Sequence, residues 1–205
     1  MTSRKTPEDR RDEILTAALK VFGHYGYRRA SMELIAQAAG ISRPALYQHF
    51  SGREDIFRAM GARMLDGVLD TARDAAARQP TLVDRVYAAL SVKLELVVGS
   101  VNAEFRTELL TEAGLVAADL MVSFKIRFAD LIEEQLAASS AELAQLGRVI
   151  SARDCADLLL DAVVGISQAD APAESLHRRL HQMVELTVLG LGLGLGLPPV
   201  ATPVH

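Results

Sequence analysis

The sequence of 205 residues has one cysteine, no tryptophan and only 5% aromatic residues. A single cysteine excludes an internal disulfide framework and a zinc site built from several thiolates. No run of about 20 uncharged apolar residues occurs, so we expect no membrane-spanning helix and no membrane partner. Residues 1–11 are charged and lack the apolar core of a secretory signal. These absences predict a protein of the reducing cytoplasm.

Charge is distributed unevenly along the chain. The net charge of −4 divides into +3 over residues 1–58 and −7 over residues 59–205. A basic segment attached to an acidic body is typical of proteins in which only that segment meets a polyanion. Half of the residues are hydrophobic, which is enough to build a buried core in one or two domains.

Apolar residues recur at helical spacing almost throughout, and strand-like alternation is confined to the Leu–Gly tail after residue 189. The spacing, together with N-capping serines and first-turn prolines, predicts an all-α fold of about nine helices. The long fourth helix is expected to bury a stripe that includes Met64. The helices are expected at about 7–25, 31–39, 42–49, 51–79, 81–98, 102–112, 115–138, 151–169 and 172–189.

Residues 31–49 predict two short helices joined by a tight turn, which is a helix-turn-helix. Ser31 and Ser42 are the expected N-caps, and Gly40 supplies the backbone freedom that the turn requires. The two helices can close a small core against the first helix of the chain. The residues expected in this core are Leu15, Leu19, Phe22, Ile35, Ala39, Ile41, Leu46 and Phe50.

This arrangement leaves one face of the second short helix free, and a helix of this size fits the major groove of B-DNA, about 12 Å wide. Arg43 on that face can bond twice to a guanine edge. Pro44 and Ala45 can press on a thymine methyl group. Tyr47 offers a ring for a base and a hydroxyl for a phosphate, and Gln48 can reach adenine or a phosphate.

Four further residues suit the phosphate backbone. His49 and Arg53 supply side chains at the far end of the helix, and Ser31 and Ser42 stand beside free N-terminal amides. Short helix pairs rich in Ala and Gly also occur in helical proteins that bind no DNA, so the spacing alone leaves that alternative open.

The order of the residues favours DNA binding over the alternative of a helix pair that binds no DNA. The relevant segments are FGHYGY at 22–27, IAQAAGIS at 35–42, LYQHF at 46–50 and REDIF at 53–57. Together they resemble the N-terminal DNA-binding domain of TetR-family transcriptional regulators, over about residues 8–60. The resemblance implies that bases are met by Arg43, Pro44 and Tyr47, and the DNA backbone by Ser31, Ala45, Gln48, His49 and Arg53. Ala30 stands where threonine is common, and Ala45 lacks a hydroxyl for a phosphate.

The resemblance also implies a domain organisation and a partner. Residues 1–58 would form the DNA-binding domain, and residues 59–205 an effector-binding and dimerisation domain. The last two helices would pack across the two-fold axis of a homodimer that binds a palindromic double-stranded operator. The expected interface residues are Leu158, Leu159, Ala162, Val163, Ile166, Leu180, Met183, Val184 and Thr187. The alternative is that these faces form the core of one subunit.

The function implied is that of a repressor released by a small effector, and the methionines and phenylalanines of the middle helices favour an apolar or aromatic one. The alternative for each candidate is ordinary core packing. The apolar candidates are Met60, Met64, Val68, Phe105, Met121, Phe124 and Phe128. The polar candidates beside them are Asn102, Arg106 and Arg127.

An all-helical enzyme and a helical interaction module without DNA binding are the competing hypotheses. No nucleophile elbow, P-loop or dinucleotide fingerprint occurs in its required context. Cys155 lies on an apolar stripe and is expected to be a buried small hydrophobe. His177 and His181 could hold a metal with a carboxylate, but a solvated helix face also explains them. We therefore expect no enzyme, no cofactor and no metal.

Overall fold

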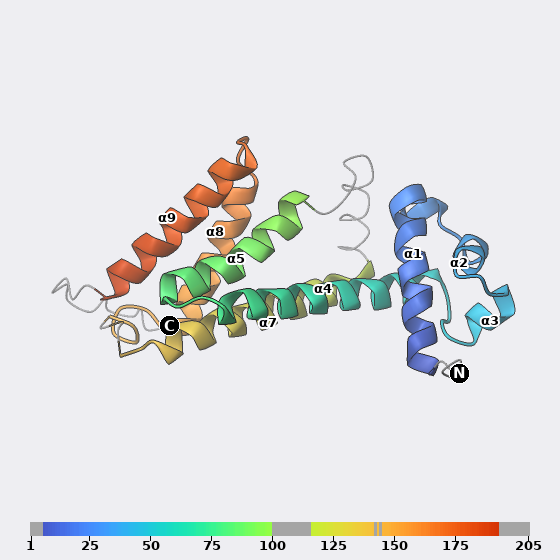
Figure 1. Ribbon diagram of the computed structural model, residues 1–205, viewed down its shortest axis with the longest axis horizontal. Coiled ribbons are helices and arrows are strands. Elements are labelled where there is room, and N and C mark those ends of the chain that lie inside the picture. Colours follow the sequence, from blue (N-terminus) through green and yellow to red (C-terminus); the bar gives the residue numbers. More distant parts are fainter. Residues whose placement is uncertain (1–5, 100–115, 142, 144, 193–205) are drawn as a thin grey trace, which may run out of the picture. The chain divides into compact units, whose positions relative to one another are not determined.

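The computed structural model describes residues 6–99, 116–141, 143 and 145–192. Helices dominate this part of the chain, and the one β-feature within it is an isolated bridge between Leu146 and Ile150 (Figure 1). The all-α prediction is confirmed there. The expected helix at 102–112 lies outside the described residues. The helices are α1 Pro7–Arg29, α2 Met32–Ala38, α3 Arg43–Tyr47, α4 Arg53–Ala77, α5 Leu82–Gly99, α7 Ala118–Ala138, α8 Ala152–Ser167 and α9 Ala173–Gly192.

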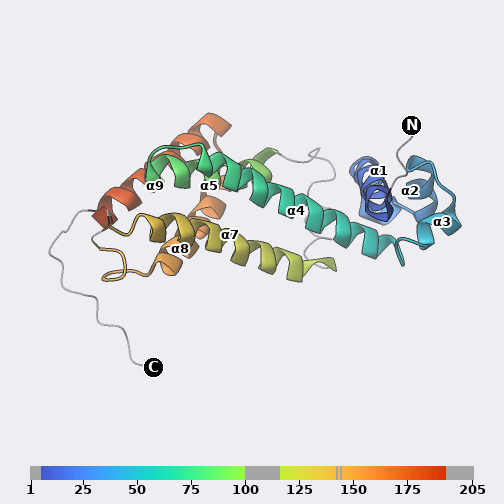
Figure 2. The same ribbon diagram turned by 60° about the horizontal axis from the view of Figure 1, so that its bottom comes forward.

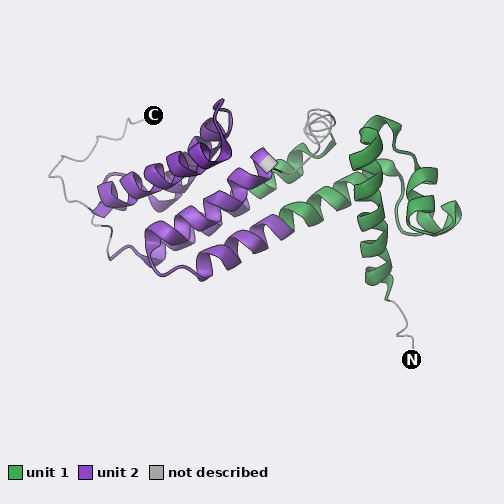
Figure 3. Cartoon of the chain, turned by 45° about the horizontal axis from the view of Figure 1, so that its top comes forward, with its two compact units in different colours: residues 1–66, 101–124 green, residues 67–100, 125–205 purple. Residues whose placement is uncertain are grey.

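The chain divides into two compact units (Figure 3). Unit 1 comprises residues 1–66 and 101–124, and unit 2 comprises residues 67–100 and 125–205. Helices α4 and α7 each contribute residues to both units. No described helix combines the length and apolar character needed to cross a membrane.

Helix α1 is longer than the sequence predicts. Thr6 and Asp9 form a capping box at its start, and the helix continues past Gly23 to Arg29. Gly26 adopts φ 75° and ψ 165°, which kinks the helix. The expected end near residue 25 coincides with this kink, but the helix resumes after it and the Ala30 amide donates to the Gly26 carbonyl at 3.2 Å.

An aromatic cluster organises the core of unit 1. The Phe22 ring meets the edge of Phe57 at 5.3 Å between centroids, and Tyr27 lies 4.8 Å from the same Phe57 ring. Such edge-to-face contacts add to the burial of apolar area. Leu19 was expected in this core, but it is 52% exposed. The row formed by Leu15, Ala18 and Phe22 fills the inner face, and Leu19 lies one position round the helix from it.

In unit 2, α5 packs against both α8 and α9, and α8 packs against α9 (Figure 1, Figure 2). The stripe predicted for α4 is wrong at Met64, which is 45% exposed, whereas Leu65 and Leu69 are buried. Two neighbouring rows of α4 both satisfy helical spacing, so periodicity alone could not choose between them. The largest fully buried side chains of unit 2 are Leu69, Leu90, Leu94, Phe128, Ile132 and Leu136.

Candidate nucleic-acid interface

Helices α2 and α3 are each fixed at their start by a serine. The Ser31 hydroxyl accepts from the Leu34 amide at 3.2 Å, and the Ser42 hydroxyl accepts from the Ala45 amide at 3.3 Å. Both predicted N-caps are thus confirmed. Gly40 in the connecting turn has φ 65°, a conformation that favours glycine. The local sequence therefore defines the start of each helix and the turn between them.

Helix α3 has one buried side and one exposed side. Leu46 is completely buried and Phe50, just beyond the helix, is 2% exposed; both belong to the core of unit 1. Arg43, Pro44 and Gln48 are exposed, as the sequence predicted. Tyr47 is 46% exposed, although it carries a large ring. A helix this short therefore presents most of its outer surface to solvent.

Two side chains on the exposed side of α3 contact each other. The Arg43 guanidinium carbon lies 5.7 Å from the centroid of the Tyr47 ring. The hydrogen bond to the Tyr47 side chain raises the pKa of Arg43 above its ordinary value. An arginine carries its charge at neutral pH in any case. A cation held beside a ring on an exposed helix is suited to a base edge with a neighbouring phosphate.

The other residues predicted to contact DNA differ in how far their side chains are exposed. Ser31 and Ser42 are exposed, and Ala45 and His49 are half-buried. The half-buried Arg53 is engaged within unit 1, which the sequence did not indicate.

The Arg53 guanidinium holds the junction between α1 and α2. Its Nη1 donates to the carbonyls of Arg28 at 3.1 Å and Ala30 at 3.0 Å. Its central carbon lies 4.5 Å from the Tyr27 ring centroid. Arg53 thus fixes the end of α1 to the start of α4.

Sequence analysis missed a second internal arginine. Arg11 of α1 donates through Nη1 to the carbonyl oxygen of His49, and its guanidinium lies 4.1 Å from the centroid of the Phe50 ring. Because 38 residues separate the hydrogen-bonded pair, no spacing in the sequence marks this contact.

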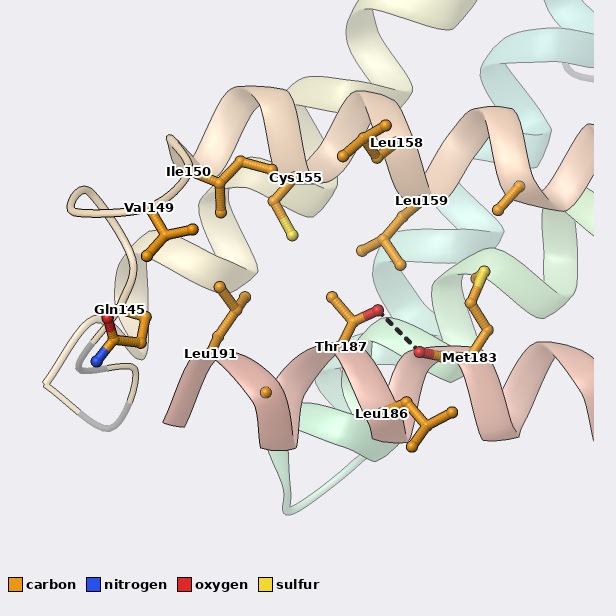
Figure 4. A pocket seen from close by; sticks show the side chains of 12 residues that line it. Gln145, Val149, Ile150, Cys155, Leu158, Leu159, Met183, Leu186, Thr187 and Leu191 are labelled. Carbon is orange, nitrogen blue, oxygen red and sulfur yellow. Dashed lines mark hydrogen bonds between the residues drawn. The ribbon is translucent and has the colours of Figure 1, made fainter. Parts of the chain in front are cut away.

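A second surface lies on α8 and α9 of unit 2. A pocket of about 460 Å³ opens between these helices and the segment before α8 (Figure 4). Its walls are almost entirely apolar, and Thr187 turns its hydroxyl inward to the Met183 carbonyl at 2.8 Å. Leu158 is 61% exposed and Leu186 is 72% exposed beside it. A contiguous apolar surface of this kind is typical of an interaction site.

The residues expected at a dimer interface fall into two groups. Leu158 is exposed, whereas Ala162, Ile166, Met183 and Thr187 are half-buried. The remaining residues are buried inside the subunit: Leu159, Val163, Leu180 and Val184. Sequence analysis missed Leu186 and Leu189, which are more than half exposed.

The effector candidates are divided between the two units. Met60 packs half-buried against the core of unit 1, and Met64 and Met121 are exposed in the same unit. Phe124 of unit 1 and Phe128 of unit 2 are buried. Val68 is half-buried and Arg127 exposed in unit 2, and three candidates lie outside the described residues: Asn102, Phe105 and Arg106.

The residues considered for enzyme or metal chemistry are engaged elsewhere. Cys155 is 2% exposed, and burial raises the pKa of its thiol, so it packs as a small hydrophobe, as expected. His177 lies 2.6 Å from the Glu95 carboxylate, and the His181 ring meets the edge of Tyr87 at 4.8 Å. Within the described residues no three metal-binding side chains come together.

Known proteins match the same part of the chain. The family of bacterial regulatory proteins called tetR matches residues 14–60, which span α1 to the start of α4. The chain is also 34% identical over 95 residues to the transcriptional activator FasR of Mycolicibacterium smegmatis, across 46% of this chain and 43% of FasR. Residues 14–60 of the chain therefore belong to the tetR family of bacterial regulatory proteins.

Two further proteins extend the comparison. The repressor AcnR of Corynebacterium glutamicum is 32% identical over 94 residues, across 44% of this chain and 50% of AcnR. The chain thus spans about half the length of these curated relatives. A solved TetR/AcrR-family regulator from Thermobifida fusca has the same fold, with a TM-score of 0.65 at 21% identity, covering 89% of this chain and 98% of that one. Both curated relatives are named as transcriptional regulators.

Proposed function

We propose that the chain is a transcriptional regulator that binds a double-stranded operator through the exposed side of α3. The observation that carries this proposal is the exposed pair of Arg43 and Tyr47 on an N-capped helix whose opposite side is buried by Leu46. A side of this size fits the major groove, where an arginine can bond to both O6 and N7 of a guanine.

Each predicted contact has a role on DNA. Arg43, Pro44 and Tyr47 read base edges. The phosphate backbone is held by Ser31, Ser42, Ala45, Gln48, His49 and Arg53. Ala45 offers only its methyl group, because its amide donates to the Ser42 hydroxyl. The contact of Arg53 comes from the guanidinium nitrogens that do not bond to the carbonyls of Arg28 and Ala30. Contacts to phosphate position the protein and contacts to bases provide the sequence preference.

The exposed surface of α8 and α9 supports a homodimer. Leu158 and Leu186 present apolar side chains around a pocket that a second copy would cover. Two copies place two α3 helices on successive major grooves, about 34–36 Å apart, which explains why a palindromic operator is expected. Joining two weak half-sites in this way multiplies the affinity of each.

An effector would act through α4, which contributes residues to both units. A small apolar or aromatic molecule that prefers one arrangement of the helical domain would change the spacing of the two α3 helices and release the operator. Repression is the mode proposed, in the cytoplasm where the chromosome lies. Among the relatives, FasR is named an activator and AcnR a repressor.

The proposal is tested by selection from a randomised duplex pool, followed by binding titrations at two salt concentrations. We expect enrichment of a palindromic site, and tighter binding to that site than to unrelated duplex. We also expect affinity to fall steeply with salt, because phosphate contacts release counterions. Enrichment of no sequence, together with weak binding that ignores salt, would refute DNA recognition.

A further inference from the structure

We propose that Arg11 is a positioning residue that sets the direction of α3, a role that rests on the proposed DNA-binding function. It touches the end of the helix from outside the helix-turn-helix. Three features of unit 1 support this role: the shortness of α3, the hydrogen bond from Arg11 to His49 and the contact of Arg11 with Phe50.

Helix α3 has few contacts of its own to fix its direction. It spans only Arg43–Tyr47, and Leu46 is its one buried side chain. Its start is fixed by the Ser42 cap. At its end, the amides of His49 and Phe50 donate back to the Leu46 carbonyl at 3.0 and 3.1 Å. The His49 carbonyl lies two residues beyond Tyr47, the last residue of α3, and accepts a hydrogen bond from a partner outside the helix-turn-helix.

Arg11 supplies that partner from α1. Its guanidinium donates to the His49 carbonyl, and a cation near the C-terminal end of a helix also interacts favourably with the helix dipole. The same guanidinium covers the Phe50 ring at 4.1 Å, and Phe50 is 2% exposed within the core of unit 1. Arg11 is therefore fixed against the core and holds the end of α3 relative to it.

The neighbouring arginine provides a matched control. Arg10 carries the same charge one residue earlier, and its hydrogen bond is to Glu13 within α1, at 2.7 Å, with both side chains more than a third exposed. Replacing Arg10 or Arg11 by methionine removes one positive charge from the same helix. Any difference between the two variants therefore reports the contact with α3 and not the change in charge.

The experiment compares Arg11→Met and Arg10→Met with the wild-type chain on two duplexes: the site selected by the wild type and an unrelated sequence. We expect Arg11→Met to reduce the preference for the selected site about tenfold, the loss that one hydrogen bond from a charged donor accounts for. We expect Arg10→Met to leave the preference within about twofold, the scale of an exposed ion pair. Partial unfolding lowers binding to both duplexes equally, so the preference does not respond to it.

Two results on DNA would overturn the inference. The first is an Arg11→Met variant whose preference equals that of Arg10→Met. The second is equal weakening on both duplexes with a salt slope reduced by about one unit, which marks a direct phosphate contact.

A second measurement does not depend on DNA. Amide hydrogen exchange at His49 and Phe50 should accelerate about tenfold in Arg11→Met and stay unchanged in Arg10→Met, because the end of α3 opens locally. If the wild type prefers no sequence, the proposed function fails, and exchange still decides the role of Arg11. Unchanged exchange at these two amides would then overturn it.

Discussion

Leu46 and Tyr47 are adjacent in α3, and the structure predicts that replacing them separates stability from DNA binding. Leu46 is completely buried, whereas Tyr47 is 46% exposed. Leu46→Ala removes three carbons at about 0.8 kcal/mol each, or about 2.4 kcal/mol before any cavity is counted. The cavity raises the expected loss in the free energy of unfolding to about 3–5 kcal/mol.

Tyr47→Ala should cost far less stability. Its contact with Arg43 at 5.7 Å is on the surface, where such a contact contributes about 0.5 kcal/mol. The expected loss in the free energy of unfolding is therefore below about 1 kcal/mol. Binding to the selected operator should nevertheless fall, because the ring leaves the DNA-facing side of α3.

The assay is urea unfolding monitored through amide exchange in α1 to α3. Operator binding is measured on the same samples at a temperature where each variant is folded. If Tyr47→Ala destabilised these helices as much as Leu46→Ala, the assignment of the exposed side would be wrong. Full operator affinity in a stable Tyr47→Ala variant would contradict the role of this side in binding.

Three further predictions concern a cap, an ion pair and the α8–α9 surface. Ser42→Ala should lower the stability of unit 1 by about 1 kcal/mol in urea unfolding, because it removes the N-cap of α3. The hydrogen bonds from Arg58 depress the pKa of Asp119, so this pair should stabilise unit 1 at neutral pH and lose its effect as pH falls below about 4. Asp119→Asn should remove this part of the acid dependence of the free energy of unfolding. An unchanged pH profile in Asp119→Asn would contradict the role of the pair. Leu186→Glu should shift sedimentation equilibrium toward monomer and weaken operator binding; a variant that stays dimeric would exclude this surface.

Much of the helix-turn-helix could be predicted because its determinants are local. The hydroxyls of Ser31 and Ser42 each cap the helix that follows by accepting a hydrogen bond from the amide three residues ahead. Gly40 allows the turn between the two helices. The exposed side of α3 follows from the burial of Leu46 on the opposite side. The caps and the turn require no knowledge of a distant segment, and the burial of an apolar residue such as Leu46 is expected from its type.

Other features depend on packing that spacing cannot determine. Leu19 and Met64 lie beside buried rows and satisfy helical periodicity almost as well as the residues that fill those rows. The continuation of α1 beyond residue 25 depends on how Tyr27 packs against Phe57 after the Gly26 kink. These outcomes were decided by tertiary contacts and not by local preference.

The arginines of unit 1 illustrate the same point for the site. From the sequence, Arg43 and Arg53 are both candidates for DNA contact, and Arg11 is not. The structure separates the exposed Arg43 from Arg53 and Arg11, whose guanidiniums bond to backbone carbonyls of α1, the segment following it and the end of α3. A sequence records the charge of an arginine but not the atoms that receive its hydrogen bonds.

The most direct test of the central claim is the binding of Arg43→Ala to the selected operator and to unrelated duplex at one salt concentration. The account predicts that operator binding weakens by about 1–3 kcal/mol and that base preference relaxes at one position of each half-site, while binding to unrelated duplex changes little. Equal weakening on both duplexes, with base preference intact at every position, would contradict it.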